Sequence, residues 1–127
     1  MIKKKEHEFW DDFIEFSDLK GETLIKVVVN DDRDEIHFHT QDGQVIRMYH
    51  EQDCCESVSI EDICGDIDDL LGVVTLAEES TNEGSSHYGE SETWTFYRLH
   101  TDRGGVTIRW YGASNGYYSE SVSLELL

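Results

Sequence analysis

The sequence predicts an α+β fold: a mainly antiparallel, curved sheet of six to seven strands, an N-terminal helix and a short central helix. Several segments alternate apolar and polar residues, as strands with one buried face do. Short turn sequences such as Asp42-Gly43 and Asn115-Gly116 join them, which favours hairpins and an antiparallel sheet. Two other stretches space apolar residues three or four apart, as helices do. At 127 residues the chain is long enough for one domain spanning residues 1–127.

The first of these helical stretches lies near the N-terminus. Apolar side chains recur there at mostly helical spacings, with acids between them: Phe9, Trp10, Phe13, Ile14 and Phe16. This pattern predicts an amphipathic helix within residues 1–20 that packs on the domain. The alternative is an arm that docks into a groove on a partner.

The next segments are strands. Residues 24–29 are rich in β-branched side chains, and residues 35–40 and 44–49 flank Asp42-Gly43 as a hairpin. With Asp42 and Gly43 as a two-residue turn, His39 pairs with Ile46 and His37 with Met48. This register places His37, His39, Ile46, Met48 and His50 on one face of the hairpin.

The second helical stretch lies in the run YHEQDCCESVSIEDICGDIDDLLG, residues 49–72. Ser59 and Asp62 form a near match to a capping box. Apolar residues follow at helical spacings, Gly65 interrupts them and Gly72 ends them: Ile60, Ile63, Ile67, Leu70 and Leu71. The run predicts one short helix, or two single turns broken near Gly65.

The remaining segments read as strands at residues 73–79, 93–101, 106–111 and 118–126, with a turn at 102–105. Residues 81–92 are rich in acids, serines and glycines, a composition typical of a mobile acidic loop.

The central run, followed by LAEE, and the later segments TWTFYRL and IRWYGASNGYYSESV resemble a family of small uncharacterised proteins encoded mainly by bacteriophages and prophages. The DCCE and RWYG–SNGYYSE runs are the most specific part of this resemblance, which covers roughly the last two thirds of the chain. It implies a phage or prophage protein made in a bacterial cytoplasm. It transfers neither an activity nor catalytic residues.

The charge of the chain limits its partners. The formal net charge is -18, and between Met48 and Tyr97 there are thirteen Asp or Glu and no Lys or Arg. Such a field argues against direct binding to nucleic acid or to an anionic membrane and favours a host protein with a basic surface. The acids expected to bind it are Glu51, Asp53, Glu56, Glu61, Asp62, Asp66, Asp68 and Asp69.

Three cysteines, Cys54, Cys55 and Cys64, are too few for a disulfide framework. We interpret them as reduced thiols of a cytoplasmic protein. No apolar segment typical of an export signal or a membrane span is present.

Two kinds of metal site are conceivable. The face with His37, His39 and His50, followed by Cys54, offers imidazole and thiolate ligands suited to a transition metal. A half-exposed polar strand face explains the same residues more simply. Two aspartate groups offer oxygen ligands for a hard cation, although a solvated acidic face is favoured: Asp31, Asp32 and Asp34, and Asp66, Asp68 and Asp69. We expect no required cofactor.

An arginine and aromatic cluster in the C-terminal half is the second ligand candidate. Its residues are Arg98, Arg109, Tyr111, Asn115 and Tyr118. Arginine and stacked rings can hold a nucleotide or another planar anion. The simpler interpretation is that Trp94, Phe96, Ile108 and Trp110 are core and that each arginine pairs with an acid.

No catalytic motif is recognisable, and the many acids near the cysteines disfavour an activated thiolate. The sequence therefore predicts a non-enzymatic phage accessory protein that binds and modulates a host factor, as an anti-defence inhibitor or a nucleic-acid mimic. The alternatives are a module that binds or sequesters a nucleotide, and a metal-binding protein.

Overall fold

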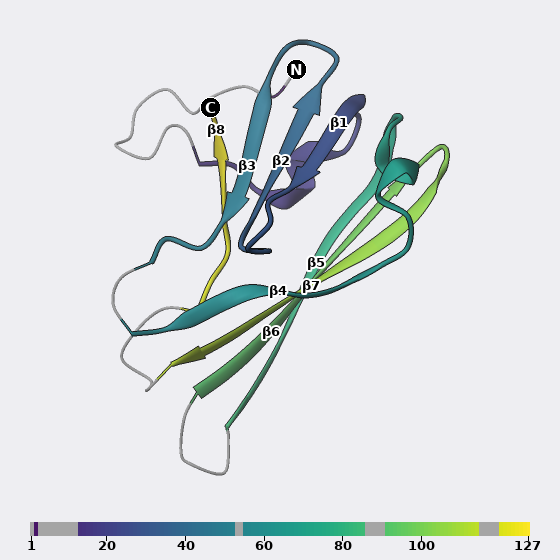
Figure 1. Ribbon diagram of the computed structural model, residues 1–127. Helices are drawn as coiled ribbons and strands as arrows, with labels where there is room; N and C mark the ends of the chain where they lie inside the picture. The colour runs from purple at the N-terminus through teal and green to yellow at the C-terminus, as the bar shows by residue number, and fades with distance from the viewer. Residues whose placement is uncertain (1, 3–12, 53–54, 86–90, 115–119) are drawn as a thin grey trace.

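The computed structural model describes residues 2, 13–52, 55–85, 91–114 and 120–127. Two four-stranded antiparallel sheets make up the structure (Figure 1). The first has the order β1 (Leu24–Val29), β2 (Glu35–Thr40), β3 (Val45–Tyr49) and β8 (Ser123–Leu126). The second has the order β4 (Ser57–Cys64), β7 (Gly104–Ser114), β6 (Ser91–Thr101) and β5 (Val74–Ser85).

The predicted α+β class is wrong, because no α-helix occurs among the described residues. Helical structure there is limited to two 3-10 turns, η1 (Phe16–Leu19) and η2 (Ile67–Leu70). Within the predicted N-terminal helix, Phe13 instead makes a β-bridge to Glu125, and η1 buries Phe16 and Leu19. The prediction also covered residues 3–12, which lie outside the described residues.

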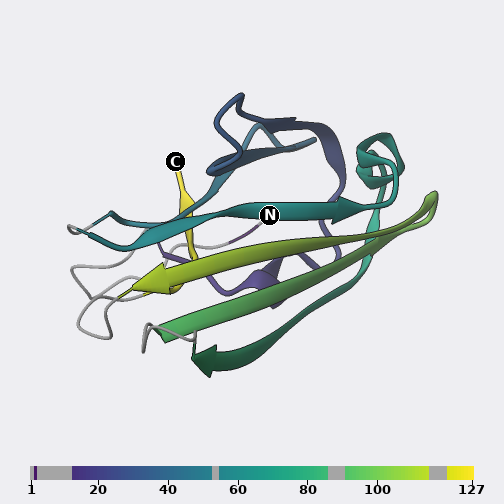
Figure 2. The ribbon, with the colours of Figure 1, turned by 60° about the horizontal axis from the view of Figure 1, so that its bottom comes forward.

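One hydrophobic core joins the two sheets, which face each other with their strands crossing (Figure 2). Alternating residues of β2, β3 and β7 supply this core, and in β3 the last residue, Tyr49, is buried as well. Phe16 adds an aromatic contact with Tyr97, at 4.8 Å between ring centroids. The largest fully buried side chains include Trp110, Tyr97, Phe16, Phe38, Ile36, Ile46, Met48 and Ile108.

The predicted central helix is a strand for most of its length. Val58 and Ile60 alternate toward the core as part of β4, and a bulge between Ile60 and Asp62 then inserts one extra residue opposite β7. The bulge makes the spacing from Ile60 to Ile63 three rather than two, which mimics a helical pattern. Only the second half forms a turn, η2, whose N-cap Asp66 accepts a hydrogen bond from the Asp68 amide at 3.0 Å.

The β2–β3 hairpin is correct in position and shifted by one residue in register. Thr40 and Gln44 close a three-residue loop, with Gly43 at φ 88°, so His39 pairs with Val45 and His37 with Arg47. A shift of one residue turns β3 over. Ile46 and Met48 therefore face the core, opposite the face that carries His37 and His39.

The expected mobile loop at residues 81–92 is strand at both ends. Residues 81–85 continue β5 and residues 91–92 begin β6, paired from Gly84↔Glu92 to Ser85↔Ser91. Residues 86–90 lie outside the described residues. The long β5–β6 hairpin carries the second sheet past the edge of the first (Figure 1).

Candidate functional site

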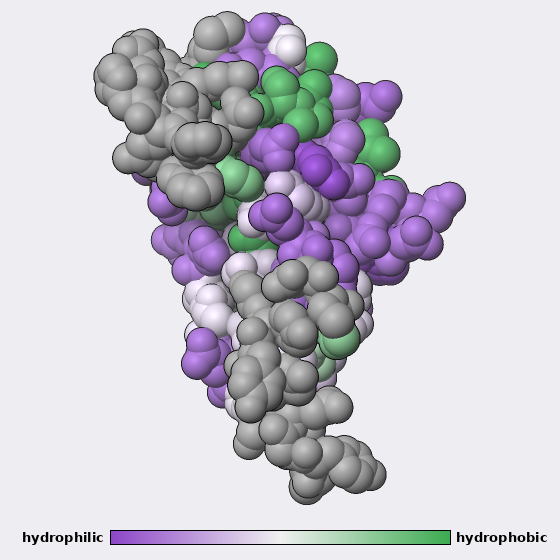
Figure 3. All heavy atoms as spheres, turned by 90° about the vertical axis from the view of Figure 1, so that its left-hand side faces the viewer, coloured by the Kyte–Doolittle hydropathy of each residue, from purple (hydrophilic) through white to green (hydrophobic). Residues whose placement is uncertain are grey.

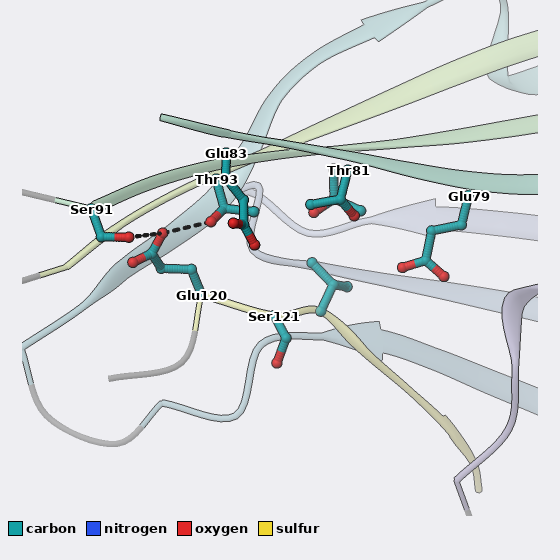
Figure 4. Close-up of a pocket in the computed structure, with 9 residues that line it drawn as sticks. Glu79, Thr81, Glu83, Ser91, Thr93, Glu120 and Ser121 are labelled. Carbon is teal, nitrogen blue, oxygen red and sulfur yellow. Dashed lines mark hydrogen bonds between the residues drawn. The ribbon is translucent and has the colours of Figure 1, made fainter. Parts of the chain in front are cut away.

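An acidic cleft lies on the inner face of the second sheet. Glu79, Thr81 and Glu83 alternate along β5, opposite Tyr97, Thr95 and Thr93 of β6. Because Tyr97 and Thr95 are buried, these glutamates share the core-facing side of the sheet. The cleft has a volume of about 340 Å³ and is lined by Glu79, Thr81, Glu83, Ser91, Thr93, Thr95, Glu120, Ser121 and Val122 (Figure 4).

Glu120 forms the buried wall of the cleft. Its carboxylate accepts hydrogen bonds from Thr93 Oγ1 at 2.7 Å, from Ser91 Oγ at 3.4 Å and from Ser114 Oγ (Figure 4 draws the first two). The buried carboxylate therefore has hydrogen-bond donors for both of its oxygens. The segment that carries Glu120 can lie this close to β7 because residue 112 of that strand is a glycine. A Cβ added to Gly112 would lie 2.8 Å from Glu120 Cβ.

The lining of the cleft contains carboxylates and hydroxyls and neither Lys nor Arg. Tyr97 donates a hydrogen bond to Glu79 Oε1 at 3.2 Å from beneath. Burial first, and then the charge of Glu79 and this hydrogen bond, raise the pKa of Tyr97 well above its usual value. The phenol therefore stays neutral, and the charges at the cleft are the negative ones of its glutamates.

The acids expected to form one binding surface are not brought together. Glu51 is exposed before β4, whereas Asp66 and Asp68 are exposed beyond its other end. Asp62 and Asp69 are half-buried, and Asp69 packs beneath Gly104. Glu61 forms an ion pair with Arg109, and Asp53 lies outside the described residues.

Glu56 is buried, which contradicts its expected role on the surface. Its side chain is 0% exposed, and Gln52 Nε2 donates to its Oε1 at 2.6 Å. His50 Nε2 lies 3.6 Å from Glu56 Oε2, and His50 Nδ1 lies 2.6 Å from the Ser121 carbonyl oxygen. The two contacts of His50 therefore connect the segment after β3 with the segments before β4 and β8.

The residues of the predicted transition-metal site are also separated from one another. His37 and His39 lie on the outer side of β2, whereas the His50 side chain is 4% exposed beside Glu56. Cys54 lies outside the described residues. In the described ranges, no group of three or more His, Cys, Asp or Glu side chains is arranged to hold a metal ion.

The cysteines differ from each other. Cys55 is disulfide-bonded, whereas Cys64 is a free, exposed thiol at the end of β4. The expectation of reduced thiols is therefore wrong for Cys55.

The arginine and aromatic cluster lies on the outer face of the second sheet. Arg98, Arg109 and Tyr111 share that face, and Asn115 and Tyr118 lie outside the described residues. Trp94 and Phe96 are half-exposed on the same face, so the expectation that they belong to the core is wrong. Ile108 and Trp110 are buried, as that interpretation expected. As expected, both arginines are near acids: Arg109 near Glu61 and Arg98 near Glu78.

Comparison with known proteins places the chain in a family. A domain of unknown function, DUF7448, matches residues 17–124. The chain belongs to the DUF7448 family. No curated protein and no solved structure matches it.

One face of this DUF7448 protein is mainly polar where its described residues are visible (Figure 3). The coloured atoms in Figure 3 are mostly hydrophilic, with hydrophobic residues in small separate patches. Among the described residues, no helical segment has the length and apolarity to span a bilayer.

Sequence reasoning missed Glu79, Glu83 and Glu120 as a group. A signal for the first two was present: Glu79, Thr81 and Glu83 alternate with Ser80 and Asn82, as residues on one strand face do. The composition of residues 81–92 outweighed it. Glu120 follows a turn sequence, and nothing in the chain indicates that it crosses back over Gly112.

Proposed function

We propose that this DUF7448 protein is a non-enzymatic, phage-encoded accessory protein that binds a basic segment of a host protein in its acidic cleft. The observation that carries the proposal is the lining: three glutamates, five hydroxyl side chains and no cation within one concave site. A Lys or Arg side chain entering it would meet acceptors on both walls.

The charge balance favours such an occupant. Glu79 and Glu83 come from β5 and Glu120 from the opposite wall, so an inserted cation would neutralise carboxylates that otherwise repel one another. An ion pair at 4 Å is worth about 1 kcal/mol in water and about 4 kcal/mol at an effective dielectric constant of 20. A basic group should therefore bind more tightly in a partly enclosed cleft than on an open acidic surface.

The net charge supports the same mode at long range. A charge of -18 accelerates encounter with basic proteins and repels nucleic acids. The phage origin and the host cytoplasm rest on the sequence resemblance, and inhibition of a host defence or nucleic-acid enzyme fits a partner that is itself basic. The cleft, rather than the dispersed acids of the central run, is the contact surface in this proposal.

A pair of double variants tests the proposal. Glu79→Gln with Glu83→Gln removes two charges from the cleft, and Asp31→Asn with Asp32→Asn removes two from an exposed turn on the other sheet. Each tagged variant and the wild type are used to capture proteins from bacterial lysate at low and high salt. The affinity of the captured basic protein is then measured by calorimetry.

We expect the cleft variant to lose about tenfold in affinity, or about 1.4 kcal/mol, and the turn variant to stay within about twofold of wild type. Equal losses in both variants would assign binding to net charge and contradict the proposal. Full affinity in the cleft variant would do so as well.

A further inference from the structure

The outer face of the second sheet carries a second, chemically different site. Pairing across β5, β6 and β7 aligns Asn82, Trp94 and Tyr111 in one row and Ser80, Phe96 and Arg109 in the next. These side chains point away from the core, because Thr95, Tyr97 and Trp110 between them are buried. The face is therefore on the opposite side of the sheet from the acidic cleft.

A shallow depression of about 280 Å³ lies on this face. Glu61, Asn82, Trp94, Phe96 and Arg109 line it. Trp94 packs against Tyr111 with ring centroids 5.2 Å apart and an interplanar angle of 51°, which fixes the indole in place. Gly84 follows Asn82 by two residues on the same face of β5, and it has no side chain to cover the Trp94 ring.

The polar end of the depression is an Arg–Glu pair. Arg109 Nε is buried and lies 2.8 Å from Glu61 Oε1, where the two side chains form an ion pair. Glu61 is the extra residue of the β4 bulge, between the pairs Ile60–Trp110 and Asp62–Arg109. This contact uses one atom of each side chain, so the terminal guanidinium nitrogens of Arg109 remain as donors and the second carboxylate oxygen of Glu61 remains as an acceptor.

We propose that this depression binds a neutral, planar heterocycle with a lactam edge, that is, a ring N–H beside a carbonyl. The ring would stack on Trp94, its N–H would donate to Glu61 and its carbonyl oxygen would accept from Arg109. In a nucleoside, hypoxanthine, guanine and uracil present this edge, whereas adenine and cytosine have no ring N–H on the edge that faces away from the sugar. Stacking on aromatic rings combined with hydrogen bonds to the base edge is a general mode of base recognition.

The charges around the site select against a phosphate group. Glu78 and Glu92 flank the aromatic rows, and Arg98 and Arg109 each already face a carboxylate. The net charge of -18 adds long-range repulsion. A free nucleoside or base should therefore bind more tightly than its monophosphate, the reverse of the nucleotide site that the sequence suggested.

Inosine and adenosine form a matched pair of probes, because they differ only at the edge that Glu61 and Arg109 would contact. Each is titrated into the isotopically labelled protein while the indole and backbone amide resonances of Trp94 are followed by NMR. We expect inosine to bind with a Kd on the order of 1 mM, in keeping with a shallow site, and adenosine to bind at least about fivefold more weakly. Inosine monophosphate should bind more weakly than inosine.

Two arginine variants separate recognition from general charge. Arg109→Met should abolish the preference for inosine, whereas Arg98→Met, which removes the same charge from the same face, should preserve it. Trp94→Leu should weaken both nucleosides. The proposal is wrong if inosine and adenosine bind alike, if millimolar inosine leaves Trp94 unshifted, or if Arg98→Met acts like Arg109→Met. None of these outcomes depends on the acidic cleft.

Discussion

Tyr49 shows how burial and charged neighbours together set the chemistry of a residue in this acidic protein. The Tyr49 hydroxyl donates to Glu125 Oε2 at 2.8 Å, and the Arg47 guanidinium lies 3.8 Å above its ring. Burial first, and then the hydrogen bond to Glu125 and its charge, raise the pKa of Tyr49 to about 12, while Arg47 opposes this rise.

The raised pKa predicts a loss of stability in alkali. The folded protein keeps a proton that the unfolded chain, with a tyrosine pKa of 10.0, releases. The free energy of unfolding should therefore fall as the pH rises from about 10 to about 12. Carbon-13 NMR of the tyrosine Cζ atoms should show Tyr49 ionising with a pKa above the ordinary tyrosine value of 10.0. In Glu125→Gln its pKa should move toward 10, and an unchanged pKa in that variant would contradict the assigned cause.

Burial of individual acids is the feature that the sequence could not provide at the residue scale. Glu56 and Glu120 look like other acids in the chain, yet they are 4% and 9% exposed. Their burial depends on donors distant in sequence, such as Thr93 and Ser114 for Glu120. Composition therefore predicted a single acidic surface. In the structure, some acids are buried, some line the cleft and others are exposed elsewhere on the surface.

At the scale of elements, strands were predictable where alternation is uninterrupted. The bounds of β1 and β2 agree with the prediction, because both strands alternate or carry β-branched residues between clear turns. The predictions were wrong where one residue breaks the period of two: the β4 bulge at Glu61 and the three-residue loop before Gln44. Both irregularities depend on the partner strand, which a single sequence does not reveal.

The crossing of the Glu120 segment over β7 gives an element-scale prediction. Gly112→Ala would place a Cβ 2.8 Å from Glu120 Cβ and 3.1 Å from Val58 Cγ2, and it should destabilise the fold by about 1–3 kcal/mol in urea unfolding. Gly84→Ala is the control, since its Cβ would only reach ordinary contact with Trp94 at 3.4 Å. It should stay within about 0.5 kcal/mol of wild type. Equal losses would show that the close approach at Gly112 is not what limits stability.

The electrostatics of the whole molecule were the most predictable property, since net charge follows from composition alone. The outer face of the second sheet nevertheless gathers Arg98 and Arg109 beside aromatic rings, while the cleft on its inner face has no cation in its lining. The two faces of one sheet thus carry two candidate sites of different chemistry. Which face each residue occupies follows from strand register, so the sites could be located only once pairing was known.

Self-repulsion at a net charge of -18 should make stability depend on salt. Added salt screens the repulsion between exposed charges, because the Debye length is about 10 Å at 0.1 M salt and becomes shorter as salt is added. We expect the Tm at pH 7 to rise by about 2–6 °C between 10 and 300 mM sodium chloride, as for a gain of about 1 kcal/mol. The same titration near pH 4.4, the isoelectric point, is the control and should show little change. A Tm that falls with salt at pH 7 would mean that the ion pairs Arg109–Glu61 and Arg47–Glu35 outweigh the repulsion, and that local pairing rather than net charge governs the fold.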